Sequence, residues 1–185
     1  MENNREIILK AVKLNPNKFK FLPDEFKNDR EISFEAVTRN GTNYKYISKF
    51  LKKDKEFIVD VVKKNKNCFC YIPKIYRKDR NIMLEAIKSN PYSLQYADPE
   101  LKKDKGLILL AINKYGGSIK YADSKFKNDI NIVKRAVSKL PYALNYASEK
   151  IKKNRMMNVK FQMINYEFIE FMEECKSFDQ ILEDY

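Results

Sequence analysis

Apolar and polar residues follow a pattern that returns every 25 residues along the chain, without an insertion. When the first residue of each period is called position 1, positions 4, 5, 8 and 9 are apolar in nearly every copy, as in Ile82, Met83, Ala86 and Ile87. This spacing places the apolar side chains on one face of an α-helix. Position 6 is usually apolar too, which widens the buried face. The pattern predicts one helix of about eleven residues in each period, packed between neighbours.

Polar residues at two positions predict where these helices begin and end. Position 1 is Asp or Asn in every copy, and such side chains accept hydrogen bonds from the unpaired N–H groups of a first helical turn. Position 12 is Asn in the first four copies (Asn15, Asn40, Asn65 and Asn90). This Asn either ends the first helix in a left-handed conformation or caps a second helix. We interpret these position 1 residues as structural N-caps: Asp29, Asp54, Asp79, Asp104 and Asp129.

A second, shorter helix is predicted after position 12, with apolar residues at positions 16, 18 and 19. One further turn, with an apolar residue at position 23, then leads to the next copy. We interpret the aromatic residues at position 18 as a packing column in the core, with hydroxyl groups that bond between copies. The alternative is a platform on which nucleic-acid bases stack between lysines. The tyrosines of this column are Tyr46, Tyr71, Tyr96, Tyr121 and Tyr146.

Six copies of the pattern cover residues 4–28, 29–53, 54–78, 79–103, 104–128 and 129–153. A unit of this size cannot bury its apolar face alone, but stacked copies can. We therefore expect an all-α fold, a right-handed α-solenoid-like stack of six helical repeats over residues 1–153. Residues 154–185 depart from the pattern and hold seven acidic and three basic residues. We expect them to form an acidic C-terminal helical cap within one continuous domain.

The segment 96–105 (YADPELKKDK), the segment 121–129 (YADSKFKND) and the helix predicted over 79–90 (DRNIMLEAIKSN) resemble the tandem modules of domain of unknown function 4116. The resemblance covers about residues 4–153. It is locally weaker in the third repeat, at Val61, Cys68 and Cys70, and in the first, at 21–23. It implies a helical repeat used for contact, with no reaction and no catalytic residues to transfer. Members of this family occur in bacteria and protists, and include large effector proteins of intracellular pathogens.

The composition argues against catalysis. The chain of 185 residues has no His, which excludes histidine-based triads and removes the commonest zinc ligand. The repeated Asp residues are explained as caps, Cys68 has no recognisable activating partner, and four glycines supply no phosphate-binding loop. We expect a protein that is not an enzyme and that uses no cofactor and no metal.

The net charge of +12 gathers at the junctions between repeats, at positions 24, 25 and 2. One interpretation is a solvated edge that keeps the protein soluble, and the other is a binding edge for an acidic partner. The residues of this basic edge are Lys27, Arg30, Lys52, Lys53, Lys55, Arg77, Lys78, Arg80, Lys102, Lys103, Lys105, Lys127, Lys152 and Lys153.

Our leading functional hypothesis is a non-enzymatic helical-repeat interaction scaffold that binds a protein, of the kind found in bacterial effectors. The alternative is nucleic-acid binding along the basic edge, and a third hypothesis is a purely structural module in a larger assembly. No apolar run approaches the roughly 20 residues that span a bilayer. Three cysteines without a framework spacing indicate a reducing compartment, so we expect a cytoplasmic protein. Secretion without a signal peptide is compatible with the same features.

Overall fold

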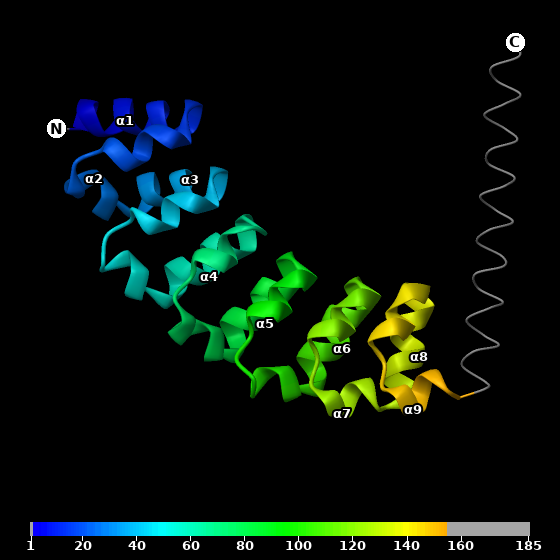
Figure 1. Ribbon diagram of the computed structural model, residues 1–185. Coiled ribbons are helices and arrows are strands. Elements are labelled where there is room, and N and C mark those ends of the chain that lie inside the picture. Colours follow the sequence, from blue (N-terminus) through cyan, green and yellow to red (C-terminus); the bar gives the residue numbers. More distant parts are fainter. Residues whose placement is uncertain (1, 155–185) are drawn as a thin grey trace, which may run out of the picture. The chain divides into compact units, whose positions relative to one another are not determined.

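A computed structural model describes residues 2–154, and every regular element in that range is a helix (Figure 1). The elements recur in one order: a long α-helix, a 3-10 helix, and a short helical turn. The long helices are α1 (Glu2–Leu14), α3 (Arg30–Arg39), α4 (Lys55–Lys64), α5 (Arg80–Ser89), α6 (Lys105–Lys114) and α8 (Ile130–Lys139). The 3-10 helices that follow them are η1 (Pro16–Phe21), η2 (Gly41–Lys45), η4 (Cys68–Tyr71), η6 (Pro91–Tyr96), η8 (Gly116–Tyr121) and η9 (Pro141–Tyr146). The short turns are α2 (Asp24–Asn28), η3 (Leu51–Lys53), η5 (Lys74–Lys78), η7 (Leu101–Lys103), α7 (Ser124–Lys127) and α9 (Glu149–Lys152).

Within the described residues the chain divides into two compact units, one up to Ala111 and one from Ile112 onward, with the boundary inside α6. In the first unit α1, α3, α4 and α5 lie side by side in chain order, and each contacts the next (Figure 1). In the second unit η8 and η9 both pack against α8. A single continuous domain stays a prediction. The cap predicted over 154–185 lies outside the described residues apart from Asn154.

From α3 onward the core contains the apolar positions that the pattern predicts for the long helices, whereas in α1 the corresponding Ile7 is exposed. Ile82, Met83, Ala86 and Ile87 of α5 are all buried, and the corresponding residues of α3, α4 and α8 are buried as well. Position 6, represented by Leu84, is only half-buried. The 3-10 helices add position 16 to the core, with the buried side chains Phe19, Tyr44, Phe69, Leu94, Ile119 and Leu144.

The second helix of each repeat is a 3-10 helix, and the Asn at position 12 is its N-cap in the first, second and fourth repeats. Asn40 and Asn90 have extended backbones with φ of −140° and −148°, and their side chains accept from the N–H groups of Thr42 and Tyr92. No non-glycine residue in the described range has a positive φ, so the left-handed alternative is wrong there. The 3-10 form suits segments of this length because its tighter hydrogen bonding is stable only over short runs.

Candidate functional site

The aspartates at position 1 occupy the N-terminal ends of the long helices. The Asp29 side chain accepts from the N–H groups of Glu31 and Ile32, each at 3.0 Å. Asp54 accepts from Phe57 at 3.0 Å. Asp79, Asp104 and Asp129 cap α5, α6 and α8 in the same way, with distances between 2.8 and 3.3 Å. These side chains therefore have a structural role that accounts for their recurrence.

The basic residue at position 2 of one repeat pairs with the capping Asp of the next repeat in the first unit. Arg5 donates to Asp29 at 2.7 Å, Lys55 to Asp79 at 2.8 Å, and Arg80 to Asp104 at 2.7 Å. Arg30 forms the same pair with Asp54. These contacts hold the pKa of Asp79 below its usual value, chiefly through the hydrogen bond from Lys55. Arg30, Lys55 and Arg80 of the basic edge are thus already compensated by carboxylates.

Three residues at position 24, Lys52, Arg77 and Lys102, instead donate to carbonyl groups at or near the end of the preceding 3-10 helix. The ammonium groups of Lys52 and Lys102 donate to the carbonyls of Lys45 and Gln95, at 2.6 and 2.9 Å. Arg77 donates to the carbonyls of Cys70 and Ile72, at 3.2 to 3.3 Å. These cations act as C-terminal caps, because the last carbonyls of a helix have no partner within it.

The remaining residues of the basic edge are distributed between short-range pairs and exposed positions. Lys27 lies 3.7 Å from Asp24 and Lys78 lies 3.9 Å from Asp98, while Lys103 and Lys152 pair with Glu100 and Glu149 three residues earlier, at 2.7 and 2.9 Å. Lys53, Lys105 and Lys153 are exposed, and Lys127 is half-buried. The edge is basic in sequence, but carboxylates and carbonyls compensate many of its cations.

The aromatic column at position 18 is only partly buried, so its interpretation as a core column is corrected. Tyr46 is 42% exposed, and Tyr71, Tyr96, Tyr121 and Tyr146 are half-buried. The reason is the 3-10 geometry: with about three residues per turn, positions 16 and 19 eclipse each other on the buried face, and position 18 falls a third of a turn away.

Cations lie over several rings of this column. The Lys45 ammonium is 5.2 Å from the ring centre of Tyr71 in the next repeat, and the Arg77 guanidinium is 5.2 Å from that of Tyr96. In the second unit Lys120 lies 5.9 Å from Tyr121 and 5.7 Å from Tyr146. Cation–π contacts of this kind stabilise exposed sites by roughly 0.5–1 kcal/mol. They place the tyrosines in a mixed aromatic and cationic surface.

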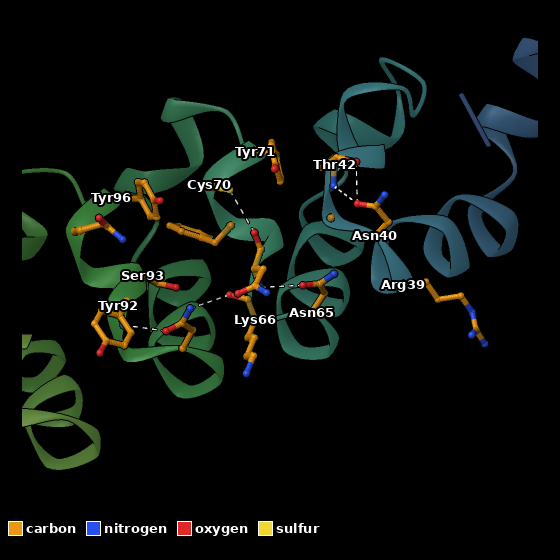
Figure 2. Close-up of a pocket in the computed structure, with 15 residues that line it drawn as sticks. Arg39, Asn40, Thr42, Asn65, Lys66, Cys70, Tyr71, Tyr92, Ser93 and Tyr96 are labelled. Atoms are coloured by element: carbon orange, nitrogen blue, oxygen red, sulfur yellow. Dashed lines mark hydrogen bonds between the residues drawn. The ribbon is translucent and has the colours of Figure 1, made fainter. Parts of the chain in front are cut away.

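A concavity of the first unit lies beside this column and runs from the end of α3 to η6 (Figure 2). We call it the asparagine hollow. Its volume is about 500 Å³. It is lined mainly by polar residues of three successive repeats: Arg39, Asn40, Gly41, Thr42, Asn65, Lys66, Asn67, Phe69, Cys70, Tyr71, Asn90, Tyr92, Ser93, Gln95 and Tyr96.

The asparagines at position 12 lie at the rim of the hollow and donate to groups of the preceding repeat, as Asn90 does to Lys66 in Figure 2. The Asn40 amide donates to the Asn17 side chain at 2.8 Å, and the Asn90 amide donates to the Lys66 carbonyl at 3.1 Å. Asn65 donates to two carbonyls of the preceding repeat, Val37 and Thr38, both at 3.1 Å. These amides connect the rim to the preceding repeat, and the exposed residues of the lining are Arg39, Thr42, Lys66, Asn67 and Tyr92.

The charge of the hollow is positive. None of the residues that line it is acidic. Arg39 pairs with Glu35 outside the lining at 2.9 Å, while Lys66 is exposed. Cys70 is half-buried at the wall, whereas Cys68 beneath it is buried, which raises the pKa of the Cys68 thiol to about 12. The hollow can therefore accept hydrogen-bonding and anionic groups, but it offers no carboxylate as a general base.

Sequence reasoning missed this hollow, although a signal was present. Asn at position 12 indicates a helix boundary, but its recurrence in the first four repeats together with the tyrosines at position 18 also indicates a polar surface. No group of three potential metal ligands exists among residues 2–154. Within the same range no helix is long and apolar enough to cross a membrane.

Comparison with known proteins identifies one family. A family profile described as "Domain of unknown function (DUF4116)" matches residues 4–52, 30–77, 54–102 and 104–152. Each match spans two adjacent 25-residue repeats, in the register deduced from the pattern of apolar residues. No match was found among curated proteins or among solved structures. Because the matches together cover most of its length, the chain belongs to the DUF4116 family of tandem helical repeats.

Proposed function

We propose that the chain is a non-enzymatic interaction scaffold, a right-handed solenoid of six repeats, that binds an acidic peptide segment of a partner protein in the asparagine hollow. The observation that carries this proposal is the lining of the hollow. It joins three tyrosines, several side-chain amides, Arg39 and Lys66, and no carboxylate. Tyrosine and arginine are enriched at the centres of protein interfaces, because they combine large apolar surfaces with polar groups.

The dimensions of the hollow suit a short extended peptide. Its lining comes from three successive repeats, and packed helices lie about 10 Å apart, so it extends over about 20 Å. An extended chain rises about 3.3 Å per residue, which corresponds to about six residues of peptide. The rim asparagines are already bonded between repeats, so little rearrangement is required on binding.

The same contacts give the nucleic-acid alternative less support. Affinity for nucleic acid comes largely from lysines and arginines that neutralise phosphates. In this chain Arg30, Lys55 and Arg80 already pair with capping aspartates. Lys52 and Lys102 donate to backbone carbonyls.

The test is selection of random short peptides from a display library on the full chain, followed by titration of the enriched peptides. We expect enrichment of Asp and Glu, and a loss of affinity of at least about tenfold for Lys66→Glu and for Tyr92→Ala, since interface tyrosines often contribute above 1.4 kcal/mol. Tyr142→Ala is the matched control, because Tyr142 occupies the same repeat position in the second unit and is exposed as well.

Two results would overturn the proposal. One is the absence of any enriched peptide, and the other is equal binding of the enriched peptides to the Tyr92→Ala, Lys66→Glu and Tyr142→Ala variants. A parallel titration with oligonucleotides distinguishes the alternative. Phosphate contacts would make log K fall with log salt by about 0.9 per duplex phosphate neutralised.

A further inference from the structure

Two apolar side chains project from the edge at which the long helices α4 and α5 begin. Phe50 is 79% exposed and Ile75 is 72% exposed. Both occupy position 22, in the second and third repeats, and this position is charged in the other four: Glu25, Glu100, Lys125 and Lys150. Single exposed apolar residues are common on protein surfaces. Two at the same position of adjacent repeats form a local feature that the packing of the core does not explain.

Lysines flank both apolar side chains. Lys49 and Lys74 directly precede Phe50 and Ile75, and Lys53 and Lys78 follow three residues later, all four being exposed. Lys78 also lies 3.9 Å from Asp98, at the limit of an ion pair. We call this surface the apolar–lysine edge, formed by Lys49, Phe50, Lys53, Lys74, Ile75 and Lys78.

The surroundings of Phe50 carry an excess of positive charge. A shallow hollow beside it is lined by four lysines (Lys27, Lys45, Lys49 and Lys52) and by two carboxylates, Asp24 and Glu25. Burial and the nearby Lys49 charge lower the pKa of Lys52. Such a surface attracts anionic groups.

The two halves of the edge act together because their repeats are packed against each other. α4 contacts α5, and α3 contacts α4 (Figure 1). Phe50 and Ile75 therefore recur one repeat apart, because they occupy the same position of adjacent packed repeats. Neighbouring helices lie about 10 Å apart, which sets the spacing of the two side chains. The edge lies at the N-terminal ends of the long helices, whereas the asparagine hollow lies at their C-terminal ends.

The side chains favour a bilayer surface over the other anionic partners. A nucleic-acid strand stacks its bases on aromatic rings, but the aliphatic side chain of Ile75 offers no such face. A folded protein partner would bind these two apolar side chains in pockets. Binding in pockets does not require lysines on both sides of each apolar side chain. A bilayer accepts projecting apolar groups below its headgroups, while the headgroups bind the flanking lysines.

We propose that the apolar–lysine edge binds the surface of an anionic bilayer, with Phe50 and Ile75 inserted below the lipid headgroups and the four lysines at headgroup level. This inference is independent of peptide binding in the asparagine hollow. It requires no spanning helix, because the chain lies on the membrane.

The experiment is co-sedimentation of the full chain with phosphatidylcholine vesicles, prepared with and without phosphatidylserine. We expect binding only with phosphatidylserine, and a loss of about tenfold or more for Lys49→Glu/Lys74→Glu, since each lysine contributes about fivefold near such a surface. Phe50→Ser/Ile75→Ser should lose about tenfold or more as well. Leu14→Ser is the matched control, because it removes an exposed apolar residue from the other end of the helices.

Several outcomes would overturn the proposal. Two of them are the absence of binding to phosphatidylserine vesicles and equal binding to both kinds of vesicle. A third is unchanged binding of the Phe50→Ser/Ile75→Ser variant, which would mean that the chain adsorbs to the vesicles through its charge alone. The proposal would also fail if single-stranded RNA displaced the protein from the vesicles and the Phe50→Ser/Ile75→Ser variant bound RNA as strongly as the unmodified chain. The four lysines would then be a binding site for nucleic acid. Far-UV circular dichroism is the check that each variant folds, and we expect folding because every substituted residue is exposed.

Discussion

Substitution of Asp79 separates two stabilising contacts that this carboxylate makes through different oxygens. Its Oδ1 atom accepts from the N–H groups of Asn81 and Ile82, at 3.0 and 3.3 Å, and so caps α5. Its Oδ2 atom accepts from the Lys55 ammonium of the preceding repeat at 2.8 Å. Asp79→Ala removes both contacts. Asp79→Asn retains an oxygen for the cap and removes the charge that pairs with Lys55.

The structure sets the relative size of the two effects. Loss of a capping side chain to Ala costs about 1 kcal/mol, within a range of roughly 0.5–2 kcal/mol. Lys55 is 66% exposed, so its ion pair with Asp79 is screened by solvent and salt. We therefore expect Asp79→Ala to lower the free energy of unfolding by about 1 kcal/mol even at high salt. Asp79→Asn should have a smaller effect, which disappears at high salt.

The assay is urea denaturation followed by far-UV circular dichroism, at about 0.1 M and about 1 M salt, where the Debye lengths are about 10 and 3 Å. The matched control is Asp129, which caps α8 with contacts of 2.9 and 3.3 Å and has no ion pair among residues 2–154. Asp129→Ala should cost as much as Asp79→Ala at high salt. Asp129→Asn should leave the stability nearly unchanged at both salt concentrations.

Equal destabilisation by Asp79→Ala and Asp79→Asn, independent of salt, would refute this reasoning. It would mean that the amide cannot replace the carboxylate at the cap, and that the two oxygens do not act separately. A smaller cost for Asp79→Ala than for Asp79→Asn would refute the capping role itself.

Three further predictions follow from local contacts. Gly116→Ala should destabilise the protein by about 1–3 kcal/mol in thermal unfolding, because its Cβ would lie 2.2 Å from the Ala136 carbonyl oxygen; an unchanged melting temperature would contradict this packing. The protein should lose stability as the pH falls below about 4, because the pKa of Asp54 is lowered by the Phe57 N–H and Arg30, and that of Asp79 by Lys55. The stability that a lowered pKa contributes is fully present when the pH is above the pKa of the unfolded state. It is lost as the pH falls through the pKa of the folded state, so Asp79→Asn should show a shallower pH dependence in the same urea assay. Finally, in a Cys175→Ser background at about pH 8, Cys70 should react with a thiol reagent before Cys68, whose pKa burial raises to about 12; simultaneous labelling would exclude the buried placement of Cys68.

Much of the local structure could be predicted from the sequence. The periodic apolar residues predict the buried faces of α3, α4, α5, α6 and α8, and Asp at position 1 predicts the first residue of each of these helices, as for Arg80 after Asp79. The first repeat departs from this pattern, because α1 begins at Glu2, before Asn4, and Ile7 is 55% exposed. These features depend on residues within a few positions of each other, so a single repeat contains the necessary information. The 25-residue period then indicates the family, which the profile matches confirm.

Contacts between repeats depended on the tertiary structure. The pairing of Lys55 with Asp79, and of Asn90 with the Lys66 carbonyl, joins residues 24 positions apart. Their partners are defined only when neighbouring helices are stacked at a particular angle and spacing.

The position 18 tyrosines illustrate the same limit. An aromatic residue beside apolar ones favours a core assignment, but the tighter 3-10 turn moves Tyr71 and Tyr96 to the wall of the asparagine hollow. The sequence by itself thus determined the helices, their caps and their repetition, because these follow from local hydrogen bonding and periodicity. Only the packing of one repeat against the next decided which charges are compensated and which side chains face solvent, since both depend on distances between residues remote in the chain.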